Sequence, residues 1–313
     1  MTLRVLITAP YLQPEIERFR PIFTAQEIEL FVPKVVERCS EAELLGYIED
    51  IDGAICGDDP FTERVLTAAT RLKVIAKWGT GIDSIDQQAC ERLGIAVRNT
   101  PNAFSEPVAD SVLGYMLAFA RRQPWMTEAM RRGVWDKLPG RTLGECTLGI
   151  VGVGNIGKAV AKRARAFNMT LLGNDPLEIS EGFLQSSGVR MAPLAELLES
   201  SDFVSISCDL NPTSRHLFND AAFARMKRGA VLINCARGPI VDERALERSL
   251  LSGHLGGAAL DVFELEPLPV TSPLLGLAQV LLAPHNANSS PRAWEFVHEN
   301  TIRNLLEGLG KQI

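Results

Sequence analysis

The stretch LGIVGVGNIGKAVAKRARAFNMTLLGNDP, residues 148–176, decides the fold of this chain. It opens with a short apolar run, passes through Gly152, Gly154 and Gly157, continues with helical periodicity and ends on an acid, Asp175. A G-x-G-x-x-G pattern alone is a weak signal. Here it lies between a predicted strand and a predicted helix, and the acid closes the next predicted strand, as a dinucleotide-binding βαβ unit requires.

Each glycine of this pattern has a predicted role. Gly152 allows the tight turn, Gly154 lets a pyrophosphate approach the backbone, and Gly157 lets the helix pack closely on the strand. The helix N-terminus offers free N–H groups and the positive end of a dipole to the phosphates. Asp175 would accept hydrogen bonds from the adenosine ribose and would repel a 2′-phosphate, so NAD is favoured over NADP. The alternative is a glycine-rich βα turn without a ligand.

Short β-branched runs alternate with helical patterns on both sides of this stretch, which indicates βα units and parallel sheets. The fold class is therefore α/β, with two doubly wound parallel-sheet domains. A helix is expected from Ser105, between the two series of runs, and a last helix over residues 291–309 could return the chain to the first domain. The runs are residues 4–9, 53–57, 72–79 and 95–100 in the first series, and TLGIVGVG, MTLLGNDP, FVSISCDL, AVLINCARG, GAALDVFE and QVLLAPHNA in the second.

The composition is that of a globular protein with a buried core. Of the 313 residues 46% are hydrophobic and 22% are charged, and the formal net charge is −6 with a pI near 5.4. This acidic balance argues against nucleic acid or an anionic membrane as a partner, since both need a basic face. No apolar run is long enough to predict a membrane span, and the N-terminus is typical of a first strand and not of a signal peptide.

The six cysteines are scattered, without the paired spacing of a metal site or of a disulfide framework. We therefore expect no metal and a cytoplasmic location, where thiols stay reduced. The cysteines are Cys39, Cys56, Cys90, Cys146, Cys208 and Cys235.

Three polar residues follow predicted strands of the second series. His285 comes after VLLAP and Arg237 lies in NCARGPIVDE, at the strand ends where ligands bind in open α/β sheets. Glu266, in DVFELEP, follows a third strand. Together the three could supply a proton carrier, a clamp for a carboxylate and an orienting acid.

Each of these residues also has a plainer interpretation. Arg237 could pair on the surface with Asp242 or Glu243. Glu266 could be a solvated loop acid, and Glu264 competes with it as the partner of a histidine. The remaining histidines are interpreted as surface or packing residues; they are His216, His254 and His298.

The motifs GVGNIGKAVAKRARAFNM, NCARGPIVDERAL, GAALDVFELEP and APHNA together resemble the D-isomer-specific 2-hydroxyacid dehydrogenase family, and the likeness runs essentially from end to end. KWGTGIDSID and VRNTPNAFSEPVAD are most similar to the phosphoglycerate dehydrogenases of that family. The resemblance implies a Rossmann NAD-binding domain at residues 101–286 and a flavodoxin-like substrate domain formed by residues 1–100 with 287–313. It also implies an NAD-dependent oxidoreductase acting on a small D-2-hydroxy acid, with D-3-phosphoglycerate as one candidate.

The same resemblance implies a role for each site residue. His285 would be the acid/base, Glu266 would orient its ring and stabilise the protonated form, and Arg237 would grip the substrate carboxylate and polarise the carbonyl. The resemblance favours Glu266 over Glu264 because Glu266 directly precedes a proline. The cofactor-side positions are Gly152, Gly154, Asn155, Ile156, Gly157, Asp175, Cys208, Cys235 and Asp261, and the substrate-side positions are Lys77, Gly79, Thr80, Gly81 and Asn102.

The sequence departs from the phosphoglycerate dehydrogenases where a phosphate would be held. Lys77 stands where an arginine is expected, and the loop CGDDPF offers Asp58 and Asp59 where another arginine would be. These acids would repel a phosphate if they faced it. HNANSSPRAW replaces the glycine-rich stretch that follows the histidine in many relatives, and because the chain stops at Ile313 no C-terminal regulatory domain is expected.

Other functions stay open on the sequence. A hydroxypyruvate or glyoxylate reductase, or a dehydrogenase of a specialised pathway such as a phosphite dehydrogenase, would differ only in the pocket. Thr80 stands where the phosphite enzyme has a lysine, and Glu266 stands where formate dehydrogenases have a glutamine. A non-enzymatic NAD-binding corepressor is a remote alternative. The region RRQPWMTEAMRRGVWDK resembles the arm through which relatives pair, so a homodimer is expected.

Overall fold

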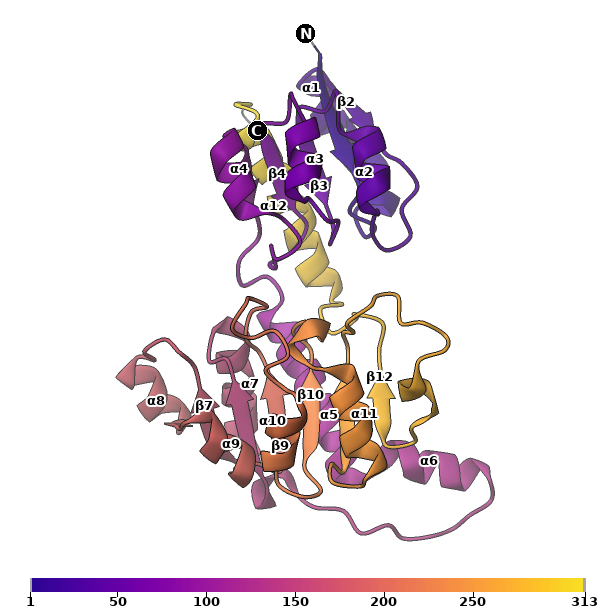
Figure 1. Ribbon diagram of the computed structural model, residues 1–313, viewed down its shortest axis with the longest axis vertical. Coiled ribbons are helices and arrows are strands. Elements are labelled where there is room, and N and C mark those ends of the chain that lie inside the picture. The colour runs from indigo at the N-terminus through magenta and orange to yellow at the C-terminus, as the bar shows by residue number, and fades with distance from the viewer. Residues whose placement is uncertain (1, 312–313) are drawn as a thin grey trace. The chain divides into compact units, whose positions relative to one another are not determined.

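A computed structural model describes residues 2–311 and divides the chain into two compact α/β units (Figure 1). The described parts of Met1–Phe104 and Ser290–Ile313 make the first unit, and Ser105–Ser289 makes the second. The boundaries between the units, after Phe104 and after Ser289, fall slightly later in the chain than the boundaries predicted at residues 100 and 286. None of the helices in the described range is both long and apolar enough to cross a bilayer.

A five-stranded parallel sheet in the order β2-β1-β3-β4-β5 forms the middle of the first unit. The chain reverses direction across the sheet between β1 and β3, which is the flavodoxin-like order. β3 and β4 are buried along their whole length, because helices cover both faces of the sheet. The strands are β1 Leu3–Ile7, β2 Ile28–Phe31, β3 Gly53–Cys56, β4 Val74–Lys77 and β5 Ala96–Arg98.

The helices of the first unit form one layer on each side of this sheet (Figure 1). One layer, α2 to α4, shares an apolar core with the strands, and its helices begin at the capping side chains Ser40, Thr62 and Asp86. On the other face α12 lies so close to β4 that a Cβ on Gly308 would fall 2.4 Å from a methyl carbon of Val74. The helices are α1 Ile16–Ala25, α2 Glu41–Tyr47, α3 Glu63–Ala68, α4 Gln87–Leu93 and α12 Pro291–Gly308, with a 3-10 turn η1 at Gln13–Glu15.

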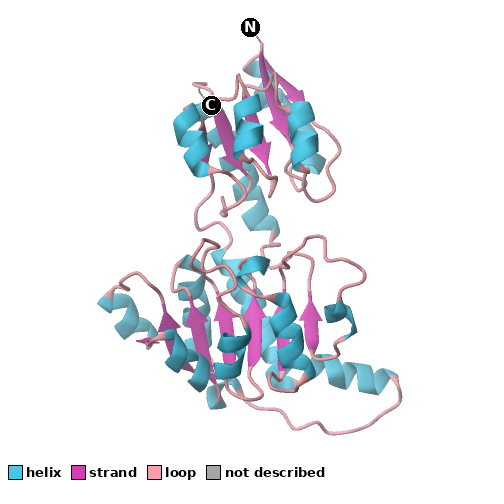
Figure 2. Ribbon diagram, viewed as in Figure 1, coloured by secondary structure: helices cyan, strands magenta, loops and turns pink. Residues whose placement is uncertain are grey.

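A seven-stranded parallel sheet in the order β12-β11-β10-β9-β6-β7-β8 forms the middle of the second unit, with helices on both faces (Figure 2). The chain reverses between β6 and β9, as in dinucleotide-binding folds, so ligands are expected at the carboxyl ends of the strands there. The strands are β6 Thr147–Val151, β7 Thr170–Asn174, β8 Arg190–Met191, β9 Phe203–Ile206, β10 Val231–Asn234, β11 Gly257–Leu260 and β12 Val280–Leu282.

The helices of the second unit divide between the two faces of its sheet. Helices α5 and α7 pack together on one face, and α9 to α11 bury apolar side chains against the other. The helices are α5 Ser105–Arg121, α6 Gln123–Arg131, α7 Asn155–Ala166, α8 Glu181–Ser187, α9 Leu194–Ser200, α10 Asp220–Arg225 and α11 Glu243–Leu251, with 3-10 turns η2 Leu143–Glu145, η3 Gly238–Ile240 and η4 Pro273–Gly276.

Two strands are absent from the sequence prediction. β2 lies at the edge of the first sheet and carries an exposed glutamate in its short sequence IELF, and β8 has only two residues. Edge strands need fewer apolar residues than central ones, so their patterns are weak. The other strands all overlap the predicted runs, and the α/β class with two doubly wound parallel sheets is confirmed.

Candidate functional site

The glycine fingerprint forms the turn between β6 and α7. Gly152 has a φ of +93°, and its Cβ would lie 2.4 Å from the backbone N of Cys208. A Cβ on Gly157 would lie 2.1 Å from the carbonyl oxygen of Gly152, so a side chain there would push the helix off the strand. Gly154 is the N-cap of α7, and its Cβ would meet nothing within 4 Å. The turn is therefore closed toward the protein and open at the helix N-terminus.

Asp175 follows β7 and reaches back to this turn. Its Oδ2 accepts a hydrogen bond of 2.7 Å from the backbone N–H of Val153, and its Oδ1 accepts one of 2.9 Å from that of Leu177. Asn155 and Ile156 are the first two residues of α7, so their N–H groups lie at the end of the helix that attracts anions. Open space, a helix N-terminus and a fixed acid suit the phosphates and ribose of a dinucleotide.

Three further cofactor-side candidates follow neighbouring strands of the same sheet. Cys208 comes after β9, Cys235 directly after β10 and Asp261 directly after β11. Burial raises the pKa of the Cys208 thiol to about 11 and that of Cys235 well above its usual range. Both thiols therefore stay protonated at neutral pH, and they can line a site only as small uncharged groups.

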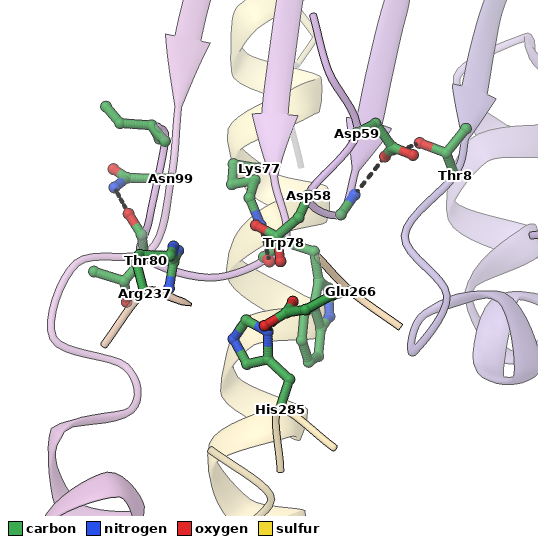
Figure 3. Close-up of polar contacts among 12 residues, drawn as sticks. Thr8, Asp58, Asp59, Lys77, Trp78, Thr80, Asn99, Arg237, Glu266 and His285 are labelled. Atoms are coloured by element: carbon green, nitrogen blue, oxygen red, sulfur yellow. Dashed lines mark hydrogen bonds and ion pairs between the residues drawn. The ribbon is translucent and has the colours of Figure 1, made fainter. Parts of the chain in front are cut away.

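His285 and Glu266 form a hydrogen-bonded pair on loops that follow β12 and β11 (Figure 3). Nδ1 of His285 lies 3.0 Å from Oε2 of Glu266, and the other carboxylate oxygen accepts a hydrogen bond of 2.9 Å from the N–H of Phe263. The side chains are only 19% and 16% exposed. With Nδ1 donating to the carboxylate, Nε2 is the nitrogen that can exchange a proton with a ligand.

Glu264 has a different histidine partner. Its Oε1 lies 2.5 Å from Nε2 of His216, and its backbone N–H donates to Glu243 over 2.6 Å. Burial raises the pKa of the Glu243 carboxyl. The two acids that compete in the sequence thus pair with two different histidines, and Glu266 is the one beside His285.

Asp261 fixes the turn that carries His285. Its carbonyl oxygen accepts a hydrogen bond of 2.7 Å from the His285 N–H, and its carboxylate accepts from the N–H groups of Asn286 and Ala287 at 2.8 and 2.9 Å. The backbone of His285 has a φ of +51°. A residue other than glycine adopts this left-handed conformation only when its surroundings impose it. The Asp261 carboxyl is 1% exposed, and burial raises its pKa.

Arg237 follows β10 and is half-buried. Its guanidinium donates to the carbonyl of Ala236 over 2.9 Å, and its own carbonyl accepts from the amide of Asn234. The next residue, Gly238, lies directly against the loop that holds Glu266, because a Cβ there would be 1.9 Å from the carbonyl carbon of Phe263. The loop that carries Arg237 and the loop that carries Glu266 are therefore in direct backbone contact.

The first unit carries the substrate-side candidates at the carboxyl edge of its own sheet. The turn from Gly79 to Gly81 follows β4, and Gly79 has a φ of +121°. Three hydrogen bonds hold this turn against the segment after β5. They run from Thr100 N–H to Gly79 O (2.8 Å), from Thr80 Oγ1 to Thr100 O (2.9 Å) and from Asn99 Nδ2 to Thr80 O (2.5 Å). Asn102 lies just beyond, with a φ of +60°.

The two acids of the β3 loop have separate environments (Figure 3). Oδ1 of Asp58 lies 3.2 Å from the ammonium nitrogen of Lys77. Asp59 is completely buried, and accepts hydrogen bonds from the hydroxyl of Thr8 and from two backbone N–H groups, those of Cys39 and Gly57. Asp59 therefore braces its loop, and Asp58 is the acid that pairs with the lysine.

The sequence missed two contacts that shape these loops. Trp78 donates its indole N–H to Nδ1 of His298, a buried residue of α12 for which the sequence indicates only a surface or packing role. The carboxylate of Glu243 accepts a hydrogen bond from the backbone N–H of Glu264. No spacing in the sequence links these residues. Between residues 2 and 311, no three His, Cys, Asp or Glu side chains are grouped so that they could hold a metal ion.

Residues 113–287 match the family model described as the NAD binding domain of D-isomer specific 2-hydroxyacid dehydrogenases. The chain is 41% identical over 265 residues to a D-3-phosphoglycerate dehydrogenase of Rattus norvegicus, an alignment that covers 83% of this chain and 49% of that protein. It is 39% identical over 274 residues to a glyoxylate reductase of Korarchaeum cryptofilum, covering 84% of this chain and 82% of that protein. The chain thus spans about half the length of the phosphoglycerate dehydrogenase.

A solved structure has the same fold over both units. It is that of a D-lactate dehydrogenase from Aquifex aeolicus in complex with NAD and lactic acid. The TM-score is 0.87 at 26% identity, and the match covers 98% of this chain and 97% of that one.

Proposed function

Since this chain belongs to the D-isomer specific 2-hydroxyacid dehydrogenase family, we propose that it is an NAD-dependent oxidoreductase that interconverts a small D-2-hydroxy acid and its 2-keto acid. The observation that carries the proposal is the His285–Glu266 pair, 3.0 Å apart on the sheet that also bears the dinucleotide fingerprint. Relatives named D-3-phosphoglycerate dehydrogenase and glyoxylate reductase leave both a phosphorylated and an unphosphorylated acid as candidate substrates.

The cofactor assignment rests on the fingerprint turn and on the match to an NAD binding domain. Gly154 leaves open space at the N-terminus of α7 for a pyrophosphate, and Asp175 offers a carboxylate of the sign that rejects a 2′-phosphate. Bound NAD would supply the hydride acceptor. Cys208, Cys235 and Asp261 would line its site from the ends of the neighbouring strands.

The proton steps fall to His285. Neutral Nε2 accepts the proton of the substrate hydroxyl as the alcohol carbon is oxidised, and returns it when the keto acid is reduced. Glu266 keeps the ring in the tautomer with Nδ1 protonated, and its charge stabilises the imidazolium that forms. Arg237 binds the substrate carboxylate and carbonyl oxygen through its forked N–H groups. In the first unit, which we propose as the substrate domain, the Gly79–Gly81 turn offers backbone N–H groups to a carboxylate, with Lys77 and Asn102 beside it.

We further propose a cytoplasmic homodimer. The segment after α5 exposes large apolar side chains, with Trp135 82% exposed and Met130 51% exposed, and such surfaces commonly mark contacts between subunits. The six cysteines are free thiols, which suits a reducing compartment. Light scattering at micromolar concentration should give twice the mass of one chain, and a monomer under these conditions contradicts the homodimer.

The activity is tested by following NADH formation from NAD with D-glycerate, D-lactate and D-3-phosphoglycerate, each beside its L-isomer where one exists. Turnover of at least one D-acid, with its L-isomer inert, is the expected result. A folded protein that binds NADH but reduces NAD with none of these acids contradicts the proposal. The reverse assay uses NADH with glyoxylate, hydroxypyruvate and phosphohydroxypyruvate.

A further inference from the structure

A buried ammonium group and two carboxyl groups meet at the carboxyl edge of the first sheet. Lys77 is the last residue of β4, and Asp58 lies in the loop that follows the neighbouring strand β3. The Lys77 nitrogen lies 3.2 Å from Oδ1 of Asp58 and donates to the carbonyl of Trp78 over 3.1 Å. Lys77 is only 4% exposed. Its positive charge is therefore already balanced inside the protein.

Asp58 balances the charge of Lys77, so the cluster has no net positive charge in either protonation state of Asp59. Burial raises the pKa of the Asp59 carboxyl, and the nearby Lys77 charge opposes that rise. With Asp59 protonated the three groups carry a net charge of zero, and with Asp59 ionised the net charge is negative. In neither state does the cluster offer an uncompensated cation to an anionic ligand.

The cluster lies within reach of the turn that the proposed function assigns to the substrate carboxylate. A Cβ built on Gly79 would lie 3.8 Å from the Lys77 nitrogen, so the ammonium group borders that turn. A small acid held there by its carboxylate would bring the substituent on its third carbon near Lys77 and Asp58. A charged substituent would then face the carboxylate of Asp58, whose side chain is 31% exposed.

We propose that Asp58 is a specificity-determining residue, which makes this site accept 2-hydroxy acids with an uncharged third carbon and reject those that carry a phosphate there. The inference rests on the proposed function. A phosphate group brings a charge between about −1.5 and −2 at neutral pH. Here it would face the carboxylate of Asp58, while the ammonium group of Lys77 is already paired with that carboxylate. A hydroxyl group on the third carbon can donate a hydrogen bond to Asp58 and accept one from Lys77. These bonds replace the ones that it makes to water.

The test compares D-glycerate with D-3-phosphoglycerate, which differ only in the phosphate. The wild-type protein should have a kcat/KM for D-glycerate at least about tenfold higher. Asp58→Asn keeps the size of the side chain and an oxygen that can accept from Lys77, but removes its charge. This variant should shift the ratio of the two kcat/KM values at least about tenfold toward the phosphorylated acid.

Two further variants isolate the local charge. Asp50 also lies in the first unit, before β3, and pairs with Arg4. Asp50→Asn therefore removes the same charge elsewhere in the unit, and it should leave the ratio of the two kcat/KM values unchanged. In a Lys77→Met background, Asp58→Asn should shift the ratio less, because the substitution no longer exposes an ammonium group. Should Asp58→Asn fold poorly, Asp58→Ser removes the same charge, and the wild-type ratio tests the inference without any variant.

Each result decides between the alternatives. A wild-type preference for D-3-phosphoglycerate overturns the inference while leaving the proposed function intact, and so does an Asp58→Asn variant whose two kcat/KM values change by the same factor. The inference also fails if Asp50→Asn shifts the ratio as far as Asp58→Asn does. A protein that binds NADH and turns over neither acid nor any other D-2-hydroxy acid contradicts the proposed function itself, and the inference falls with it.

Discussion

The indole N–H of Trp78 donates a hydrogen bond to Nδ1 of His298 over 2.9 Å, and both side chains are almost completely buried. Trp78 directly precedes the Gly79–Gly81 turn, so a histidine of α12 holds the residue from which the chain enters that turn. Nδ1 can accept this bond only while the lone pair is free of a proton. The packing around the turn therefore depends on a neutral His298.

This dependence predicts a loss of stability in mild acid. Burial lowers the pKa of His298; the charges of Glu295 and Glu15 raise it and that of Arg18 lowers it. Because the folded pKa is depressed, the unfolded chain binds a proton, with a pKa of about 6.5, that the folded chain does not. The stability that this histidine contributes is complete above that pH and is lost as the pH falls.

Urea unfolding at pH 7.5 and pH 5.5 measures this loss. His298→Gln keeps a hydrogen-bond acceptor but does not titrate, so its stability should fall less over this range than that of the wild type. The other titrating groups are common to both proteins and cancel in the comparison. His254→Gln, which changes a histidine of the second unit, should retain the wild-type difference in stability between the two pH values. Equal slopes for wild type and His298→Gln would falsify the role given to His298.

His285→Ala should lower kcat by roughly 10²–10⁴, because the reaction loses its acid/base. NADH affinity, measured by fluorescence titration, should stay within a few-fold of wild type, since the dinucleotide is held by the turn between β6 and α7. His216→Ala is the matched control, because that histidine also pairs with a glutamate but with Glu264. If both variants lose turnover to the same extent, the assignment of the acid/base to His285 is wrong.

Asp175→Ala should weaken NAD binding and narrow the preference for NAD over NADP. The substitution removes a negative charge that would face a 2′-phosphate, and it also releases the N–H of Val153. Asp175→Asn separates the two effects, since its amide oxygen can still accept from Val153 while the repulsive charge is gone. Ratios of kcat/KM for NAD and NADP are the readout. An unchanged ratio in both variants contradicts the role of Asp175.

Gly238→Ala should lower both stability and turnover. The new methyl group would overlap the backbone of Phe263, and relieving such overpacking typically costs about 1–3 kcal/mol. The movement would separate the loops of Arg237 and Glu266, so kcat/KM should fall even at temperatures where the protein stays folded. Gly276→Ala adds the same methyl group where nothing lies within 4 Å. A Gly238→Ala protein with wild-type Tm and kcat/KM contradicts this contact.

The sequence predicts the parts of this protein that depend on local pattern. The glycine fingerprint identifies its own turn because Gly152 and Gly157 are required by close backbone contacts. Central strands are recognised by their apolar runs, whereas the edge strand β2 and the two-residue β8 are not. Candidate residues at strand ends follow from topology alone, because the carboxyl ends of parallel strands share one edge.

Side-chain partners lie beyond such patterns. Asp58 and Asp59 are adjacent in sequence, yet one pairs with Lys77 and the other is buried under three hydrogen bonds. Glu264 and Glu266 likewise take different histidines. Backbone direction in a loop decides which way each side chain turns, and no period in the sequence records it.

The anchoring of His285 through Asp261 has a consequence for how substrate preference can change. The proposed proton carrier, its orienting acid and the proposed clamp all lie in one compact unit, Ser105–Ser289, where Asp261 holds the turn that carries His285. If the proposed roles hold, we expect substitutions in the loops after β3 and β4 to change the preferred acid without altering the residues proposed to move the proton.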